Sequence, residues 1–224
     1  LGRGSTLGAL YAGRDGGDYR NQAGGVDGFL RLGESDMVLF QFLRSDTRYP
    51  FSLAVEQGQP TGAFGGNALQ AQYIHQTRSF LAFAAYQDID PGFRADSGFM
   101  PRVDTRMVDL MTGVTVYGKR GGGRRGEWFD QLRFTIRALR VEDHSGRLTD
   151  SRVALGAQYD GPWQSVVQLL GRWNQEYYAG KLYDTSDVVL MALLKPASGL
   201  SLGLEGNLAN AIDYANARSA AALR

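Results

Sequence analysis

The sequence predicts an all-β fold, an antiparallel up-and-down transmembrane β-barrel with about 11–12 strands in residues 1–224. Three observations predict it. Apolar and polar residues alternate with a period of two through eleven segments, each near the roughly ten residues that a tilted membrane strand needs. The connections between these segments alternate between short and long. Tyr and Trp gather near the predicted strand ends, where amphipathic rings sit at the headgroup level of a membrane.

The composition is compatible with this fold and excludes several others. The formal net charge is +1, which argues against a dedicated nucleic-acid binder. There is no Cys, so disulfide scaffolds, Cys-bearing zinc sites, iron–sulfur clusters and thiol catalysis are excluded. Gly accounts for 30 of the 224 residues, nearly twice its usual share of about 7%. The chain begins without a charged and apolar leader, so we expect any signal peptide to be removed or to lie outside it.

Eleven strands are predicted, and the clearest shows how the two faces differ. In this strand Phe134 and Ile136 lie on one face, while Arg133 and Arg137 lie on the other. Alternation with charge on one face is typical of a half-exposed antiparallel strand. In chain order the predicted strands are 5–13, 22–32, 37–45, 67–76, 79–88, 105–117, 128–141, 150–160, 163–173, 186–195 and 200–212.

The connections indicate which strand ends share a side of the membrane. Short turns rich in Gly, Asp, Pro and Ser are expected at 33–36, 77–78, 160–162 and 196–199. Outer-membrane barrels have such turns on the periplasmic side and longer loops outside. Because eleven is odd and single-chain bacterial barrels have even strand numbers, either one strand has been missed or residues 1–224 are part of a larger barrel, and we favour the second interpretation. The long loops are expected at about 14–21, 46–66, 89–104, 142–149 and 174–185.

Aromatic residues near strand ends are expected to form the two interfacial girdles of a barrel. The alternative is that Tyr and Trp are simply common in strands. The predicted girdle residues are Tyr11, Tyr73, Tyr86, Tyr117, Trp128, Tyr159, Trp163 and Trp173.

One loop carries a resemblance to a known family. The segment 86–104, YQDIDPGFRADSGFMPRVD, resembles the signature of the DUF5916 family of bacterial outer-membrane proteins. The stretches 3–8 and 21–28 also resemble the strand pair that precedes that loop in the family. The resemblance implies a large C-terminal barrel, often preceded by a carbohydrate-binding-like domain of family 9 type. The signature positions are Asp88, Asp90, Pro91, Gly92, Phe93, Arg94, Asp96, Gly98, Phe99, Pro101, Arg102 and Asp104.

The acidic residues of this loop allow three interpretations. Carboxylates at close spacing can bind Ca²⁺, and a pair of acids can catalyse glycoside hydrolysis. Because Arg94, Arg102 and Arg106 match the four Asp almost one to one, we favour internal salt bridges that fold the loop over or into the barrel mouth. His75 and His144 have no obvious ligand neighbour in the sequence, so they are expected to be ordinary surface or strand-end residues.

Charged residues on the polar faces of the strands are candidates for lining the lumen. Guanidinium groups would favour anionic or hydrogen-bonding solutes such as phosphates and sugars. The alternative is that these charges cross-link neighbouring strands and stiffen the wall. The candidates are Asp27, Arg31, Asp109, Arg133, Arg137, Arg152, Arg172 and Glu205, together with several Gln residues that include Gln70 and Gln72.

The sequence therefore predicts an outer-membrane channel, transporter or docking protein for a small polar solute, which can be a carbohydrate. The alternatives are a soluble all-β carbohydrate-binding module and a structural barrel that scaffolds a partner complex. No nucleophile elbow or HExxH motif is present, so no enzyme activity, cofactor or metal is expected. The expected location is the bacterial outer membrane, and the expected partners are its lipid and lipopolysaccharide, the solute and a protein partner, but no nucleic acid.

Overall fold

The computed structural model describes residues 4–98, 100–119, 122–123, 126–216 and 218–223. The chain divides into two compact units. Unit 1 comprises Leu1–Ile74, Ala84–Val108 and Val141–Arg147, and unit 2 comprises His75–Phe83, Asp109–Arg140 and Leu148–Arg224.

Most of the described residues lie in β-strands, which confirms the predicted all-β class. The strands are β1 Thr6–Gly16, β2 Tyr19–Arg31, β3 Asp36–Arg48, β4 Phe64–Gln76, β5 Phe80–Ile89, β6 Thr105–Tyr117, β7 Gln131–Glu142, β8 Leu148–Gly161, β9 Ser165–Tyr178, β10 Lys181–Ala197, β11 Leu200–Asp213 and β12 Arg218–Leu223. Two short helices, α1 Phe51–Glu56 and η1 Pro162–Gln164, lie in connections. No helix among the described residues is long and apolar enough to cross a membrane.

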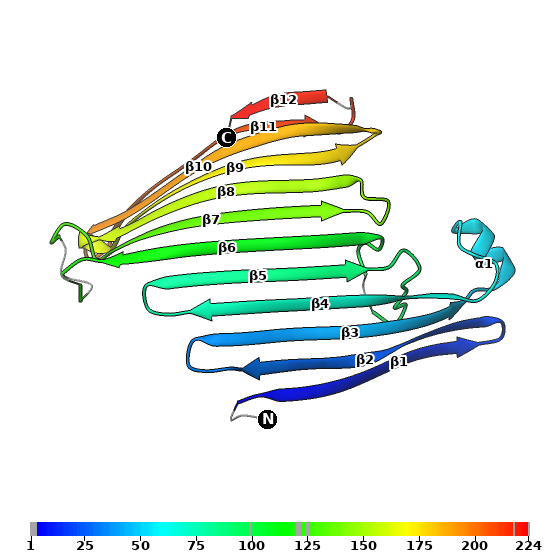
Figure 1. Ribbon diagram of the computed structural model, residues 1–224. Helices are drawn as coiled ribbons and strands as arrows, with labels where there is room; N and C mark the ends of the chain where they lie inside the picture. Colours follow the sequence, from blue (N-terminus) through cyan, green and yellow to red (C-terminus); the bar gives the residue numbers. More distant parts are fainter. Residues whose placement is uncertain (1–3, 99, 120–121, 124–125, 217, 224) are drawn as a thin grey trace. The chain divides into compact units, whose positions relative to one another are not determined.

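The strands follow one another in chain order in one antiparallel meander, from β1 to β12 (Figure 1). This order has two ends, so the described strands form an open sheet, and the expected barrel is not closed within them. The short β12 pairs only with Leu208–Asp213 of β11, so residues 200–207 have no further strand partner among the described residues. An edge of this kind leaves backbone groups available to another strand.

All eleven predicted strands are present, with bounds that differ by up to five residues. Two connections that were expected to be long are short. Strands β1 and β2 are joined at residues 17–18, and β9 and β10 at Ala179 and Gly180, so the loops expected at 14–21 and 174–185 are tight turns. Ala179 and Gly180 have φ values of 48° and 83°, the left-handed pair that a type I′ hairpin requires. The polar residues that suggested loops belong to the extended strand ends instead.

The connections at 49–63, 90–104 and 143–147 are longer and match three of the expected loops. One of them, the 90–104 connection, contributes a side chain to a buried apolar cluster in unit 1. Phe93 from the 90–104 connection packs with Ala68 of β4 and Ile89 of β5, and partly buried apolar side chains surround the three. This core positions the connection that carries most of the candidate site residues.

Candidate functional site

The 90–104 connection is fastened to β4 by main-chain contacts that only glycine permits. A Cβ atom on Gly92 would lie 2.4 Å from the carbonyl oxygen of Gly65, and one on Gly66 would lie 2.5 Å from the nitrogen of Phe93. Without side chains at these positions the two backbones can touch. The Phe93 side chain is consequently 0% exposed.

Buried polar side chains of β2 and β3 form hydrogen bonds to the backbone of the same connection. The amide nitrogen of Asn21, a residue that is 1% exposed, donates to Thr47 Oγ1 at 2.8 Å and to the Arg94 carbonyl at 3.1 Å. The amide oxygen of Asn21 accepts a hydrogen bond from the backbone nitrogen of Asp96 at 2.9 Å. The hydroxyl of Ser45 accepts from the backbone nitrogen of Arg94 at 3.0 Å. These side chains provide hydrogen-bond partners for backbone groups of the connection that are buried against the strands.

Two stacked tyrosines hold the Asp96 carboxylate. The hydroxyls of Tyr19 and Tyr49 both donate to Asp96 Oδ2, and the ring centroids of the two tyrosines lie 5.6 Å apart. Burial, followed by the hydrogen bond to Asp96, raises the pKa of Tyr49 above its usual value. Tyr49 therefore remains a neutral donor to the carboxylate across the physiological pH range.

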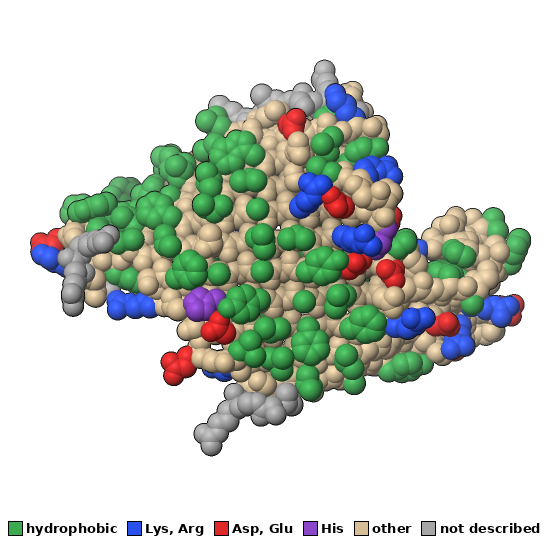
Figure 2. Space-filling model, viewed as in Figure 1, with side chains coloured by type: hydrophobic (Ala, Val, Ile, Leu, Met, Phe, Trp, Pro, Cys, Tyr) green, Lys and Arg blue, Asp and Glu red, His purple; other side chains and the backbone are tan. Residues whose placement is uncertain are grey.

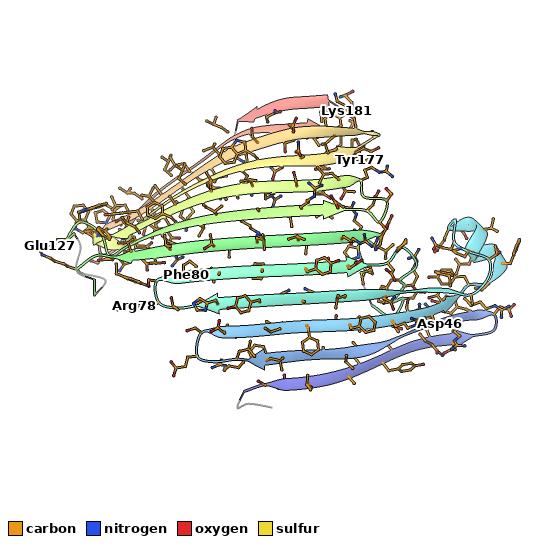
Figure 3. The ribbon with its side chains drawn as sticks, in the orientation of Figure 1. Asp46, Arg78, Phe80, Glu127, Tyr177 and Lys181 are labelled. Atoms are coloured by element: carbon orange, nitrogen blue, oxygen red, sulfur yellow. The ribbon has the colours of Figure 1, made fainter. Side chains whose placement is uncertain are left out.

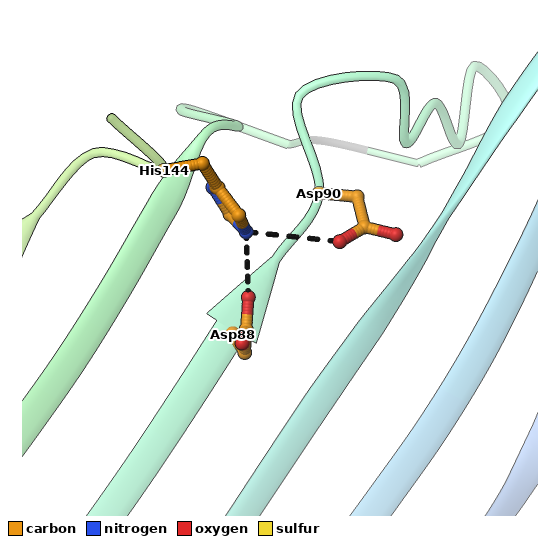
Figure 4. A group of neighbouring side chains, drawn as sticks. All are labelled: Asp88, Asp90 and His144. Carbon is orange, nitrogen blue, oxygen red and sulfur yellow. Dashed lines mark hydrogen bonds and ion pairs between the residues drawn. The ribbon is translucent and has the colours of Figure 1, made fainter. Parts of the chain in front are cut away.

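A histidine lies among three carboxylates at the end of β5, and Figure 4 shows it with two of them, Asp88 and Asp90. His144 Nε2 lies 2.8 Å from Asp88 Oδ1 and 3.7 Å from Asp90 Oδ1, and His144 Nδ1 lies 2.9 Å from Asp104 Oδ1. The ligand atoms of Asp88, Asp90 and His144 lie within 4.8 Å of one another, as in a metal site. However, carboxylate oxygens only accept, so both ring nitrogens are placed to donate protons to them. These distances are those of hydrogen bonds and ion pairs between an imidazole and carboxylates. The sequence had shown no obvious ligand neighbour for His144, because these partners come from β5 and the 90–104 connection.

The predicted one-to-one pairing of Asp with Arg in this loop is replaced by more varied partners. Asp88 does pair with Arg106, across 3.2 Å. Asp90, by contrast, accepts two hydrogen bonds from Asn67, at 2.8 and 2.9 Å. Arg94 donates to backbone carbonyls and to Gln59 rather than to an Asp. Main-chain and tyrosine donors can bond to the carboxylates of this connection because the connection folds back onto the strands. Of the remaining signature positions, Pro91, Gly98, Pro101 and Arg102 lie in the connection, and Phe99 lies outside the described residues.

Six of the eight lumen candidates share one face of the strands in unit 2, which we call the polar face. The register pairs Arg152 with Asn174 and Arg172 with Asp187, so alternate residues of β8, β9 and β10 point the same way. The remaining two candidates lie on β2 in unit 1, on the face that also carries Asn21. The six on the polar face are Asp109, Arg133, Arg137, Arg152, Arg172 and Glu205, and the two on β2 are Asp27 and Arg31.

Most charges of the polar face cross-link neighbouring strands. Arg172 donates to Asp187 through two nitrogens, with N–O distances of 2.9 and 2.5 Å. Arg137 likewise donates through two nitrogens to the carboxylate of Asp109, and Asp109 is only 4% exposed. Arg152 donates to Asn174 Oδ1 at 2.7 Å. These contacts favour the strand-stiffening interpretation for the paired residues, whereas Arg133 and Glu205 are exposed on this face.

The opposite face of unit 2, which we call the apolar face, is a bare hydrophobic surface. Leu155 of β8, for example, lies beside Leu169 of β9, which is 49% exposed, and Leu169 pairs directly with Leu190 of β10. Hydrophobic side chains gather over β8–β11 in Figure 2. The members of the apolar face are Phe134, Ile136, Val153, Leu155, Val167, Leu169, Trp173, Val188, Leu190, Leu200, Leu202, Leu204 and Leu208.

Aromatic residues lie at both ends of the strands in unit 2. At one end Trp128 stacks on Tyr159 with a centroid distance of 5.8 Å, and the Tyr159 hydroxyl donates to the Trp128 carbonyl. At the other end Tyr178 and Tyr214 pack edge to face. Figure 3 shows Arg78 and Glu127 at the first end, and Tyr177 and Lys181 at the second.

The other predicted girdle residues differ in their placement. Tyr117 and Trp163 lie at the first end of unit 2, whereas Trp173 lies on the apolar face, five residues before the end of β9. In unit 1, Tyr11 lies within β1, and Tyr73 and Tyr86 bond to Asp36 and Asp88 near their strand ends.

Several residues of the loop anchor escaped the sequence analysis. Asn21 and Thr47 fell in the loops expected at 14–21 and 46–66, and Ser45 was the last residue of a predicted strand, although all three are almost fully buried. Their alternation with charged neighbours was a usable signal, because such small polar residues on one face often bond a buried backbone.

The chain was compared with protein families, with curated proteins and with solved structures, and no match was found. The functional proposal therefore depends on the geometry described above.

Proposed function

We propose that this chain is a large part of a bacterial outer-membrane β-barrel, in which the apolar face meets lipid and the polar face lines the interior. In this proposal the barrel conducts or docks a small polar solute. The single observation that carries it is the sidedness of β8–β11: one face is bare and apolar throughout, whereas the other holds paired charges and amides, with apolar residues such as Leu170 and Leu193 among them.

The dimensions of the apolar face support contact with a bilayer. On β11 it runs from Leu200 to Leu208, eight steps of about 3.4 Å and so about 27 Å along the strand. For a strand tilted by about 40° this corresponds to about 21 Å across the membrane, near the band of about 25 Å in outer-membrane barrels. Leu204, within this run, is 63% exposed. A soluble protein rarely leaves an apolar surface of this extent uncovered.

The polar face supports an interior role. Its ion pairs join adjacent strands, so each charged group keeps an oppositely charged partner even where little water is present. In unit 1 the 90–104 connection folds onto the face of β2 and β3 that carries Asn21 and Ser45. A loop held against a polar face would narrow the interior of a barrel. We therefore propose that it shapes the passage and has no catalytic role.

The sequence resemblance to the DUF5916 family agrees with this proposal, and membership of that family is part of what we propose. Closure of the barrel would need further strands, because β1 and β12 are open edges among the described residues. The edge at residues 200–207 is where such a strand would add.

Tryptophan quenching by brominated lipids tests the proposal. The chain has three Trp residues, so each can be studied by changing the other two to Phe. The full chain is reconstituted into vesicles whose lipids carry bromine either deep in the acyl chain or near the headgroup. Trp173, which is 51% exposed on the apolar face, should be quenched from within the acyl chains. Trp128 and Trp163 should be quenched more strongly by bromine near the headgroup.

The result that overturns the proposal is a folded β-protein whose Trp173 is quenched by neither lipid. If such a protein were monomeric or dimeric in detergent-free buffer, a soluble sandwich with a covered apolar face would replace the barrel. Heat-modifiable gel mobility of the same samples provides a second readout, because closed membrane barrels resist unfolding until boiled.

A further inference from the structure

A cleft of about 270 Å³ opens on the face of unit 1 that carries Asp27. Asp27 on β2 pairs directly with Gln41 on β3, and Gln70 and Gln72 on β4 complete the polar lining. The volume lies near the lower end of the range of about 300–1,000 Å³ for small-molecule sites, so it suits a single small solute.

Glycine makes room for the carboxylate in this cleft. A Cβ atom on Gly8 of β1 would lie 2.8 Å from Asp27 Oδ1, closer than such atoms approach. Because Gly8 has no side chain, the carboxylate can lie over the neighbouring strand. Asp27 itself lies six residues along β2 from Asn21, about 20 Å from the anchor of the 90–104 connection.

The polar groups of the cleft have unused hydrogen-bonding capacity. Within the part of the chain that the structure describes, no hydrogen bond or ion pair is found for the side chains of Asp27, Gln41, Gln70 or Gln72. This contrasts with Asp109 and Asp187, which each have an arginine partner. All four cleft side chains are half-buried, so their contact with water is restricted. Such groups are well suited to a polar ligand.

We propose that this cleft binds one neutral monosaccharide unit. The Asp27 carboxylate accepts hydrogen bonds from sugar hydroxyls, and each Gln amide can both donate to and accept from a hydroxyl. Phe29, which also lines the cleft, offers an apolar surface for the sugar's C–H groups. None of the described residues that line the cleft is cationic, so the charge of Asp27 would repel a phosphorylated or sulfated sugar. This inference rests on the proposed function and specifies the solute class of the interior.

Saturation-transfer NMR of the full chain in detergent micelles tests the inference. The probes are glucose, galactose, mannose and N-acetylglucosamine, with glucose 6-phosphate as the anionic comparison. At least one neutral sugar should receive saturation, and glucose 6-phosphate should receive much less. Asp27→Asn should weaken binding of that sugar by about tenfold, because a hydrogen bond to a charged group is lost.

The matched control is Asp18→Asn, the same chemical change in the exposed turn between β1 and β2. This variant should bind the sugar as the unchanged chain does. Gln70→Leu, which preserves the side-chain size, should weaken binding as Asp27→Asn does. A circular dichroism spectrum of each variant verifies that the sheet is intact.

Two results would overturn the inference: no transfer to any of the four neutral sugars in the folded chain, or equal binding by Asp27→Asn. Failure of the barrel proposal is distinguishable from both. If the lipids did not quench Trp173 while sugar binding remained, the cleft would stand in a soluble protein. If quenching occurred without sugar binding, the barrel would stand and the cleft assignment would fail.

Discussion

The backbone nitrogen of Asp96 donates a hydrogen bond to Asn21 Oδ1, and this bond joins residues 75 positions apart in the chain. Asn21 lies in β2, and Asp96 lies in the connection between β5 and β6. The same Asn21 side chain also binds the Arg94 carbonyl and the Thr47 hydroxyl. One buried amide therefore satisfies three groups that would otherwise lack a partner.

Asn21→Ala should destabilise the protein by about 1–3 kcal/mol, because it leaves buried partners unsatisfied. It should also increase proteolytic cleavage within residues 90–104. The measurement is the free energy of unfolding together with the cleavage rate. The control is Gln22→Ala, which is on the opposite face of the same strand and bonds only to exposed side chains. Equal effects of the two substitutions would contradict the anchoring role of Asn21.

Gly92→Ala should displace the 90–104 connection, because the new Cβ atom would meet the Gly65 carbonyl. Overpacking of this kind costs about 1–3 kcal/mol. Gly33→Ala, in a turn where a Cβ atom meets nothing within 4 Å, should have little effect. Hydrogen exchange of the amides in residues 90–104 gives the comparison. An unchanged exchange rate in Gly92→Ala would show that the connection does not need the close approach.

Arg137→Glu should impair assembly, because it places a second carboxylate beside the buried Asp109. We expect a loss of about 2 kcal/mol or more, since hydrogen bonds to charged groups contribute about 1.5–3 kcal/mol. Arg133→Glu, on the same strand and face but exposed, should assemble normally. If both variants folded equally well in detergent, as judged by gel mobility, the Arg137–Asp109 pair would have no structural role.

Tyr49 should make stability fall at alkaline pH. Its pKa in the folded protein is raised, mainly by burial and then by the bond to Asp96, whereas an unfolded tyrosine titrates near about 10. Its contribution is therefore complete below pH about 10 and is lost as pH rises toward the folded pKa. Between pH 9 and pH about 11.5 this amounts to up to about 2 kcal/mol. Tyr49→Phe should reduce this loss, and Tyr11→Phe, at an exposed site, should not.

Leu169→Arg and Gln168→Arg place the same charge on neighbouring residues of opposite faces. In a bilayer the charge on the apolar face should cost about 2–4 kcal/mol, and the charge on the polar face much less. The free energy of folding into vesicles measures both. In a water-exposed sheet the two substitutions would have similar, small effects, and that outcome would contradict lipid contact.

The period-two alternation predicted the strands well because it reflects a local property: successive side chains of a strand point to opposite faces. Strand β6 was predicted with the bounds that the structure has, residues 105–117. The turn at Ala179 and Gly180 was missed because the polar residues around it resemble a loop when only composition is considered.

The partners of individual charges were harder to predict. Arg94 was expected to pair with an Asp, but it binds carbonyls and Gln59. His144 had no obvious ligand neighbour in the sequence, but it lies 2.8 Å from Asp88. Such choices depend on which segments meet, and sequence spacing does not contain that information.

The sequence by itself determined the all-β class, the strands and the division of each strand into a polar and an apolar face, because these follow from local alternation. Only the tertiary structure decided that residues 90–104 fold onto β2–β4, that Asn21 anchors them and that Asp27 meets three Gln side chains in one cleft. These contacts join residues far apart in the chain. They depend on the register of the strands, which brings those residues together.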